Sequence, residues 1–548
     1  MNTVFTMAPG PQQTKVFSDN HIETFQNLDV TNMVIFSTNS LDSSKNMLEE
    51  ASQKGIQCKV IKLTQLSTDG IEDADQLSGL PWNIANEMIS AYSGLESTIT
   101  MHGRGSNLHS HLLWVVANSF GSASLNWDGG YVSSYVHNES QLNSEVSPKL
   151  MSAILELTAK KAVEFFDSAS IAAEDGVTEV SGVQASSLPC INKGYLEKIK
   201  TGSRKKKSSS KNDTTLYKLT REGFPVALKY WSEQRAEIET PKFKQLLISS
   251  GRLVDGGSKN LLNILSKIDA HDSYLFLLQK YSSDLESGVF SVDELLNNSE
   301  YEEVHEDLEY FRNLLSRKKE EEDFDMIPTI VVINPSSSSE YSLQLQSRIF
   351  SEIRKFEFEK DLHYWNFDIT ACFSKILPTL SEFITASRSN LSYVLKSKKG
   401  TGVTGTPIGT SPFSKADHVL ELPSYLALES IKKLKDSKLM SLVVMLYFEE
   451  GALSKQNTSM NLMEFINRDR SVSVNEGLTF KDLSKFVEPL SEIVGHEIGI
   501  EKNHTRLAGD LISNKFIIRV NDVGTSRYVL TELGKFVAIW LRKQLGWA

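Results

Sequence analysis

The stretch Tyr217-Lys-Leu-Thr-Arg-Glu-Gly-Phe-Pro-Val-Ala-Leu228 aligns without a gap to Tyr528-Val-Leu-Thr-Glu-Leu-Gly-Lys-Phe-Val-Ala-Ile539. Six of the twelve positions are identical: Tyr, Leu, Thr, Gly, Val and Ala. A shorter match lies upstream, where Ser147-Pro-Lys-Leu-Met-Ser152 resembles Asp436-Ser-Lys-Leu-Met-Ser441. Because the two matches occur in the same order, the sequence predicts a chain that is built twice on one plan.

The first half begins with short β-rich runs that alternate with amphipathic runs. Strands that alternate with helices are typical of a parallel sheet in an α/β domain. The predicted order is strand Asn32–Thr38, helix Leu41–Lys54, strand Gln57–Leu63, helix Pro81–Ser93, strand Ser97–Met101, helix Leu108–Phe120 and strand Ser122–Trp127.

The second half repeats this alternation more faintly. The predicted elements are strand Thr329–Ile333, helix Ser342–Phe356, strand Leu362–Thr370, helix Ser374–Arg388, strand Asn390–Leu395 and a short strand Val419–Leu422. We therefore expect a second α/β unit that is degenerate relative to the first.

The segments around the repeated motif favour a winged helix-turn-helix in each half. In the second copy, Lys481–Val494 is the predicted supporting helix and Asn503–Ile512 the predicted recognition helix. Phe516–Val520 and Ser526–Leu530 are the predicted hairpin strands, because Asn, Asp and Gly between them suit a tight turn. In the first copy we expect the recognition helix at Asn192–Lys200 and a hairpin through residues 201–220.

These patterns predict a fold class of α/β plus α+β, with two Rossmann-like units, each followed by a winged helix. Residues 241–325 look mostly helical and end in an acidic run, which predicts a linker. The expected division is a loose tail over 1–30, Rossmann-like unit 31–146, winged helix 147–235, helical linker 236–326, Rossmann-like unit 327–435 and winged helix 436–548.

Composition limits the function classes. The net charge of −11 argues against a protein that coats nucleic acid over its whole surface, so any such contact must be local. No apolar run approaches the roughly 20 residues of a membrane span. Three cysteines lie far apart, without clustered histidines. We expect a cytoplasmic protein with no membrane contact, disulfide framework, metal site or cofactor.

The first predicted hairpin carries a dense cationic segment. Residues 198–211 hold seven Lys and Arg residues and no acid, which favours contact with the phosphates of double-stranded DNA. For this first segment, a solvated loop and a localisation signal stay open as alternatives. In the second copy, Asp510 and Asp522 interrupt the basic residues. Weak DNA contact and a dimerisation surface in a homodimer both stay open for that copy. The candidate DNA-binding residues are Lys193, Lys198, Lys200, Arg204, Lys205, Lys206, Lys207, Lys211, His504, Arg506, Arg519 and Arg527.

A glycine-containing turn joins the third predicted strand to the next helix. Open α/β sheets bind ligands at the carboxyl ends of their strands, and a helix N-terminus there favours an anion. Arg104 adds a cation, although a tight turn with a surface arginine stays an alternative. The candidate ligand-binding residues are Ser37, Thr38, Asn39, His102, Gly103, Arg104, Gly105, Ser106 and Asn107.

Over residues 30–235, and more weakly 327–548, this architecture resembles the CARF winged-helix proteins, which are CRISPR-associated Rossmann-fold sensors joined to a DNA-binding module. The resemblance implies binding of cyclic oligoadenylate across paired sensor domains. The segment His102–Asn107 stands in place of the family's usual loop, and Thr370-Ala-Cys-Phe-Ser-Lys375 in the second half lacks its glycines. A duplicated chain would build within one polypeptide the pair that relatives make from two.

We therefore expect a ligand-responsive DNA-binding transcriptional regulator that senses a nucleotide-like anion. No nucleophile elbow or metal-nuclease signature occurs, so no enzyme activity is expected. Two rivals stay open. One is an effector ribonuclease that uses Arg104 and His109, and the other is an assembly protein whose winged helices bind proteins.

Overall fold

The protein is described here from a computed structural model. The structure describes residues 2–8, 23, 25–38, 42–64, 74–92, 98–102, 104–120, 123–126, 131–132, 148–161, 166–167, 189–199, 216–236, 244–250, 270–278, 288–299, 302–322, 329–333, 346–347, 349–351, 354, 362–369, 372, 377–387, 389–395, 418–421, 436–450, 477–495, 497–520 and 526–547. Within these residues, no helix combines the length and the apolar character that a membrane crossing requires.

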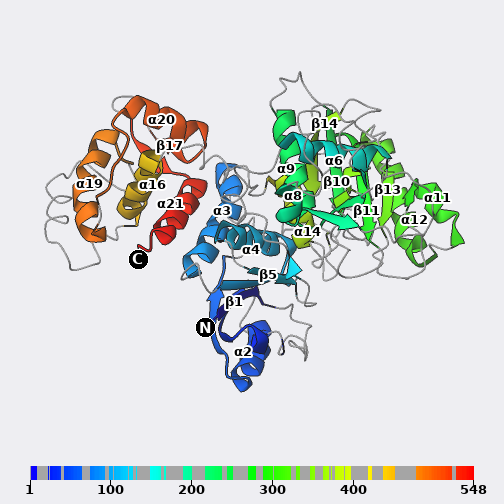
Figure 1. The fold of residues 1–548 in the computed structure, drawn as a ribbon, viewed down its shortest axis with the longest axis horizontal. Helices are drawn as coiled ribbons and strands as arrows, with labels where there is room; N and C mark the ends of the chain where they lie inside the picture. The colour runs from blue at the N-terminus through cyan, green and yellow to red at the C-terminus, as the bar shows by residue number, and fades with distance from the viewer. Residues whose placement is uncertain are drawn as a thin grey trace, which may run out of the picture.

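The first α/β domain is a six-stranded sheet with the order β3-β2-β1-β4-β5-β6 (Figure 1). All neighbours pair in parallel except β5 and β6. The strands are β1 (Asn2–Met7), β2 (Val30–Ser37), β3 (Gln57–Lys62), β4 (Thr98–His102), β5 (Ala123–Asn126) and β6 (Tyr131–Val132), and the helices are α2 (Asp42–Gln53), α3 (Ala74–Ala91) and α4 (Asn107–Phe120). The predicted α/β fold is confirmed, and the predicted strands and helices between residues 32 and 127 are present.

The expected loose tail over residues 1–30 is wrong, because β1 is a central strand of this sheet. β1 pairs with β2 on one side and with β4 on the other. Val4 and Phe5 are fully buried, and the Thr6 hydroxyl donates to the carbonyl oxygen of Met101 at 3.3 Å. β1 has only six residues, two of them threonines, so its hydrophobic pattern is too weak to predict a strand from the sequence. It is buried because parallel neighbours flank it on both sides.

The core above this sheet is aromatic. The rings of Phe5 and Tyr92 stack with centroids 3.9 Å apart, and Phe36 lies 6.2 Å from Phe5. The Tyr92 hydroxyl lies 2.9 Å from the Thr100 hydroxyl, so the buried phenol keeps a hydrogen bond. This packing holds the end of α3 over the middle of the sheet.

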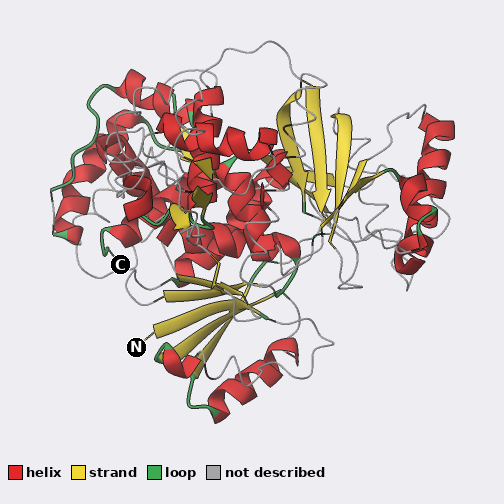
Figure 2. Ribbon diagram, turned by 45° about the vertical axis from the view of Figure 1, so that its right-hand side comes forward, coloured by secondary structure: helices red, strands yellow, loops and turns green. Residues whose placement is uncertain are grey.

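The second α/β domain is a seven-stranded sheet with the order β12-β13-β11-β10-β14-β15-β16, and Figure 2 shows both sheets in yellow as separate layers. Its strands are β10 (Lys244–Ser250), β11 (Ala270–Leu278), β12 (Gly288–Phe290), β13 (Thr329–Ile333), β14 (Leu362–Asp368), β15 (Asn390–Leu395) and β16 (His418–Glu421), and its helices are α11 (Val292–Leu296), α12 (Glu302–Glu322) and α14 (Leu377–Ala386). The central strand β10 pairs with β11 and β14, as β1 pairs with β2 and β4. Antiparallel strands lie at the edges: β6 in the first sheet, and both β12 and β16 in the second.

The expected helical linker over residues 236–326 is therefore wrong in its first part. That segment contains the strands β10, β11 and β12 as well as the two helices α11 and α12. Leucine-rich runs such as Leu246–Ile248 and Leu275–Leu278 suit a helix by propensity, and pairing within the sheet overrides that preference.

The C-terminal module has the element order that we predicted for the second winged helix. After α16 (Asp436–Glu449) come α19 (Phe480–Val494), α20 (His504–Ser513), the hairpin strands β17 (Ile517–Arg519) and β18 (Tyr528–Leu530), and α21 (Glu532–Gln544). A bridge between Leu478 and Tyr528 adds a third backbone segment beside the hairpin. Asn503 caps α20 by accepting a hydrogen bond from the backbone N–H of Arg506.

The middle module shows a similar order, but it differs at the segment for which the sequence predicts a recognition helix. It consists of α6 (Pro148–Lys161), β7 (Phe166–Asp167), α8 (Pro189–Asn192), β8 (Leu196–Ile199), β9 (Leu216–Leu219) and α9 (Gly223–Ala236). The predicted recognition helix Asn192–Lys200 is wrong. Gly194, with a φ of 77°, follows the end of α8, and Leu196–Ile199 form a strand that pairs with β9.

The repeated Thr-x-x-Gly has the same geometry in both modules. Thr220 and Thr531 each accept a hydrogen bond from the N–H of the glycine three residues later, at 3.0 Å. An added Cβ on Gly223 would lie 2.1 Å from the carbonyl oxygen of Tyr195, and one on Gly534 would lie 1.9 Å from that of Phe516. The motif therefore joins the last helix of each module to the first strand of its hairpin.

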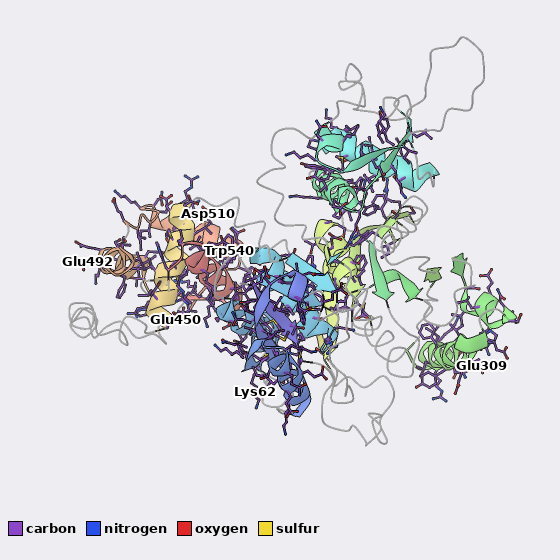
Figure 3. The ribbon with its side chains drawn as sticks, turned by 60° about the horizontal axis from the view of Figure 1, so that its bottom comes forward. Lys62, Glu309, Glu450, Glu492, Asp510 and Trp540 are labelled. Carbon is purple, nitrogen blue, oxygen red and sulfur yellow. The ribbon has the colours of Figure 1, made fainter. Side chains whose placement is uncertain are left out.

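The modules pack across the halves of the chain (Figures 1 and 3). The C-terminal helix α21 lies on α3 of the first α/β domain, and Figure 3 labels Trp540 at that boundary. The middle module instead contacts the second α/β domain, where the Arg354 guanidinium lies 2.8 Å from the Glu156 carboxylate. Helices α4 and α14 bring the two α/β domains together.

Candidate functional site

The loop after β4 lies at the carboxyl ends of the parallel strands. Gly105 has a φ of 80°, and a Cβ there would lie 3.0 Å from the Cβ of Met7 at the end of β1. The Ser110 hydroxyl donates to the carbonyl oxygen of Arg104 at 3.0 Å, which ties the loop back to the first turn of α4. The glycine thus allows a close approach between the loop and the central strand.

Ser106 directly precedes α4 and contacts a buried histidine. Its exposed hydroxyl lies 2.6 Å from Nδ1 of His109, and the N–H of Ser110 donates to its carbonyl oxygen at 2.9 Å. Burial lowers the pKa of His109 to about 4, while a backbone hydrogen bond with Thr64 acts in the opposite direction. His109 is therefore neutral at physiological pH and can accept a proton from the serine.

Arg104 provides a partly buried positive charge at this loop. Burial lowers the pKa of its guanidinium to about 10, and the carboxylate of Glu50 acts in the opposite direction. The side chain stays protonated at neutral pH and is less solvated than a surface arginine. Such a charge suits an anion more strongly than a fully hydrated cation does.

The sequence did not indicate Thr64 and Glu87, which add a polar contact at the same edge. Thr64 follows β3, and its N–H donates to the Glu87 carboxylate at 2.7 Å, while its hydroxyl donates to the other carboxylate oxygen. Glu87 lies on α3, so this helix holds the loop after β3. Neither residue belongs to a recognisable motif, and only the fold brings Thr64 to His109.

The other candidate ligand residues have different environments. Ser37 is buried and Thr38 half-buried after β2, so both lie at the same edge as Arg104. His102 is buried in β4, and burial lowers its pKa to about 3, which keeps it uncharged. Asn39 and Gly103 lie outside the described residues.

The second α/β domain meets the first at this loop. The Asn107 amide donates to the carbonyl oxygens of Ile369 at 2.9 Å and Cys372 at 2.6 Å, which follow β14. One helical turn further on, Nδ1 of His111 lies 3.0 Å from the buried Ser381 hydroxyl of α14. The loops that follow the matching strands β4 and β14 are therefore in direct contact.

The candidate DNA-binding residues are only partly described. Lys198 is exposed on β8 and Lys193 is half-buried before it. On the C-terminal module, Arg506 of α20 and Arg519 of β17 are exposed, Arg527 is half-buried, and His504 is the first residue of α20. Lys200, Arg204, Lys205, Lys206, Lys207 and Lys211 lie outside the described residues.

The C-terminal module neutralises one of the acids that interrupt its basic surface. The buried Lys438 of α16 forms an ion pair with Asp510 of α20. Arg506 is exposed on α20, and the charge of Asp510 on the same helix is balanced by the buried Lys438. The other interrupting acid, Asp522, lies outside the described residues.

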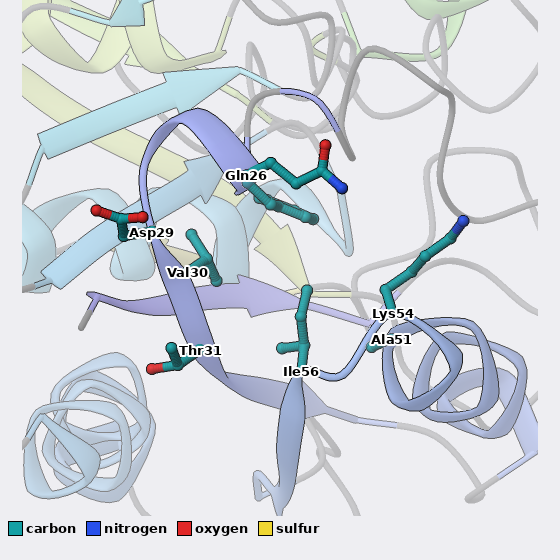
Figure 4. Close-up of a pocket in the computed structure, with 8 residues that line it drawn as sticks. Gln26, Asp29, Val30, Thr31, Ala51, Lys54 and Ile56 are labelled. Atoms are coloured by element: carbon teal, nitrogen blue, oxygen red, sulfur yellow. The ribbon is translucent and has the colours of Figure 1, made fainter.

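A pocket of about 270 Å³ lies at the opposite end of the first sheet (Figure 4). Phe25, Val30 and Ile56 form its apolar part, and Asp29 and Lys54 are exposed at its rim. It is remote from the loop after β4. Among the described residues, no group of His, Cys, Asp and Glu has the arrangement of a metal site.

Comparison with known proteins gives structural similarity alone. No protein-family model and no curated protein matches the chain. A Csm6 from Enterococcus italicus, bound to cyclic hexa-2'-fluoro-hexa-dAMP, is similar with a TM-score of 0.22 and 11% identity; the match covers 46% of this chain and 56% of that protein. A type III CRISPR defence DNA nuclease activated by cyclic oligoadenylate is similar with a TM-score of 0.31 and 9% identity, over 94% of this chain and 80% of that one.

These two structures correct one expectation. The expectation of no enzyme activity, which rested on absent motifs, is withdrawn: one of the two structures similar to this chain is a DNA nuclease. At TM-scores of 0.22 and 0.31 they assign no activity to this chain.

Proposed function

We propose that the edge where the two α/β domains meet binds a nucleotide-like anion, with cyclic oligoadenylate as the candidate ligand. The observation that carries this proposal is the contact of Asn107 with the carbonyl oxygens of Ile369 and Cys372. It places two loops that follow equivalent strands side by side, at the start of α4. Matching loops from two domains suit a ligand that has repeated phosphates.

The chemistry of the first loop supports an anionic ligand. The N-terminus of α4 directs backbone N–H groups and the positive end of the helix dipole toward this edge. Arg104 supplies both the charge and the hydrogen-bond donors for a phosphate. Ser37 and Thr38 lie at the carboxyl end of β2, which β1 separates from β4, and would contact the rest of the ligand.

The duplicated plan belongs to the same proposal. In each sheet a central strand, β1 or β10, pairs in parallel with a neighbour on either side, and both modules share the Thr-x-x-Gly geometry. We infer that the chain contains two CARF-like domains and two winged helices, which pair within one polypeptide. The basic segment 198–211 and the exposed face of α20 would bind double-stranded DNA when the ligand shifts the modules.

A ligand-binding measurement on the full chain tests the proposal. Calorimetric titration with cyclic oligoadenylates of several ring sizes should show binding to the unmodified protein. Arg104→Ala should weaken it by about tenfold or more, because a hydrogen bond to a charged group stabilises by about 1.5–3 kcal/mol. Lys54→Ala removes an exposed cation at the opposite end of the sheet and serves as the control.

Two results would contradict the proposal. One is the absence of binding for every ring size. The other is equal weakening by Arg104→Ala and Lys54→Ala, which would show that the protein attracts the ligand only through its overall charge.

A second candidate function is a ligand-controlled nuclease. It is favoured by the neutral His109, which lies 2.6 Å from Ser106 and near Arg104 at the same loop. Incubation with labelled RNA and DNA, with and without cyclic oligoadenylate, should then show cleavage that His109→Ala abolishes. Cleavage that persists in this variant would exclude His109 as the general base.

A further inference from the structure

The C-terminal helix α21 packs on a domain from the other half of the chain. Near its start, the Asn86 amide of α3 donates to the carbonyl oxygen of Glu532 and to its carboxylate, each at 3.0 Å. The rings of Trp82 and Phe536 lie 5.2 Å apart in the same interface. The contact combines apolar packing with buried hydrogen bonds, so it is a specific interface.

Near its end, α21 caps two helices of the first α/β domain. The Lys543 ammonium donates to the carbonyl oxygen of Ser90 at 3.0 Å and to that of Tyr92. The indole N–H of Trp540 donates to the carbonyl oxygen of Ser119 at 2.7 Å. The last carbonyls of a helix lack partners within it, and a cation there is favoured by the helix dipole. α21 therefore supplies donors to the carboxyl ends of α3 and α4.

The same two helices also reach the candidate ligand site. On α3, Glu87 holds Thr64 and directly follows Asn86, which contacts α21. Helix α4 begins directly after Ser106, and Ser119, which contacts α21, lies in its last turn. Each helix thus contacts the ligand edge at one place and α21 at another. A helix transmits displacement along its length because its packed interior resists compression.

We infer that α21 is a latch, formed by Glu532, Trp540 and Lys543, which couples occupancy of the ligand edge to the position of the C-terminal module. This inference rests on the proposed function for the identity of the ligand. Displacement of α3 and α4 by the ligand changes the contacts of the latch and releases or reorients the module. By thermodynamic linkage, the factor by which the ligand shifts the equilibrium of the latch equals the factor by which release of the latch changes ligand affinity.

Hydrogen exchange of the full chain without ligand tests the latch directly. Lys543→Met keeps the length of the side chain and removes the ammonium. Exchange should increase by about tenfold or more in the last turns of α3 and in α21, because a charge-assisted hydrogen bond is lost. Exchange should also increase at residues 62–64 and in the first turn of α4.

Arg542→Met is the matched control. Arg542 is the neighbouring residue, but its partners Glu450 and Tyr447 belong to its own module, where its guanidinium lies 2.6 Å from the Glu450 carboxylate. This variant should increase exchange within the C-terminal module and leave α3 unchanged. If Lys543→Met leaves α3 unchanged, or loosens α3 but not residues 62–64 and α4, the inference is overturned.

A ligand titration of the Lys543→Met variant distinguishes failure of this inference from failure of the proposed function. Titration of the Lys543→Met variant with a cyclic oligoadenylate that binds the unmodified protein should show a change in affinity of about fivefold or more. An unchanged affinity would overturn the coupling while leaving the ligand site intact. Absence of any ligand binding would contradict the proposed function, and the exchange experiment would still decide whether the latch reaches the strand ends.

Discussion

At the glycines of the repeated motif, a single neighbouring carbonyl oxygen leaves no room for a side chain. Gly223 and Gly534 each face a carbonyl oxygen at a distance that excludes a Cβ. The glycine was visible without a structure as one of six identical positions in the sequence repeat. Its role was not visible, because the carbonyl oxygens of Tyr195 and Phe516 lie 18 to 28 residues upstream. The motif joins helix to hairpin, and the candidate DNA-binding residues lie elsewhere.

Gly534→Ala should destabilise the C-terminal module by about 1–3 kcal/mol, because the added methyl forces backbone apart in a packed turn. Gly509→Ala is the control. It lies in α20 with nothing within 4 Å of an added Cβ, and alanine there should stabilise by about 0.5–1 kcal/mol. Chemical unfolding of both variants measures the difference. Similar stability of the two variants would show that the Phe516 carbonyl can move without cost.

His109 should make stability depend on pH. Its pKa is about 4 in the folded state against 6.5 for an exposed histidine, so the unfolded chain binds more protons between these values. Stability therefore falls as pH decreases through this window, by about 2 kcal/mol at pH 5 for this residue. His109→Gln should reduce the fall in unfolding midpoint between about pH 7.5 and about pH 5. An identical fall in the variant would assign the acid sensitivity to other groups.

At the level of elements, long periodic segments were predictable and short or leucine-rich strands were not. Helix α4 and strand β2 are strongly patterned and appear close to their predicted bounds. β1 is short and terminal, and β10 reads as a helix by propensity. Both are central strands, so their assignment depends on neighbours that are distant in sequence. The same reason explains why the Thr64 contact with Glu87 was missed.

Deletion of residues 1–8 tests the assignment of β1. A loose tail could be removed without effect, whereas loss of a central strand exposes the ladders of β2 and β4 and opens the core around Tyr92. We expect the shortened chain to lose the folded first domain, seen as protease sensitivity between residues 25 and 126. A protected first domain in the shortened chain would contradict the central position of β1.

At the level of the whole molecule, the contacts cross between the halves. Glu156 of the middle module accepts a hydrogen bond from the Trp231 indole and pairs with Arg354 of the second half, whose guanidinium lies 5.2 Å from the Trp231 ring centroid. α21 makes the reciprocal contact with the first half. The sequence predicted two halves, and it carried no sign that each module would pack on the opposite α/β domain.

Two separate halves should therefore assemble. Fragments divided between residues 236 and 244, produced together with a tag on one, should copurify through the contacts of α21, α4 and Glu156. Lys543→Ala and Arg354→Ala together should reduce the recovery of the untagged fragment, because both remove charge-assisted contacts across the division. Fragments that purify separately, each folded, would show that the covalent connection alone holds the halves together.

The contact of Asn107 with the second domain has a consequence for how such a pair evolves. In an assembly of identical subunits, every substitution appears on both sides of the shared site, and the pair dissociates on dilution. Here the two sides are tethered at an effective concentration on the order of millimolar, so pairing does not depend on expression level. Each side can also change alone, and the glycine-containing loop before Asn107 facing Cys372 is already an unequal pair. An unequal pair can hold the two halves of one ligand through different contacts.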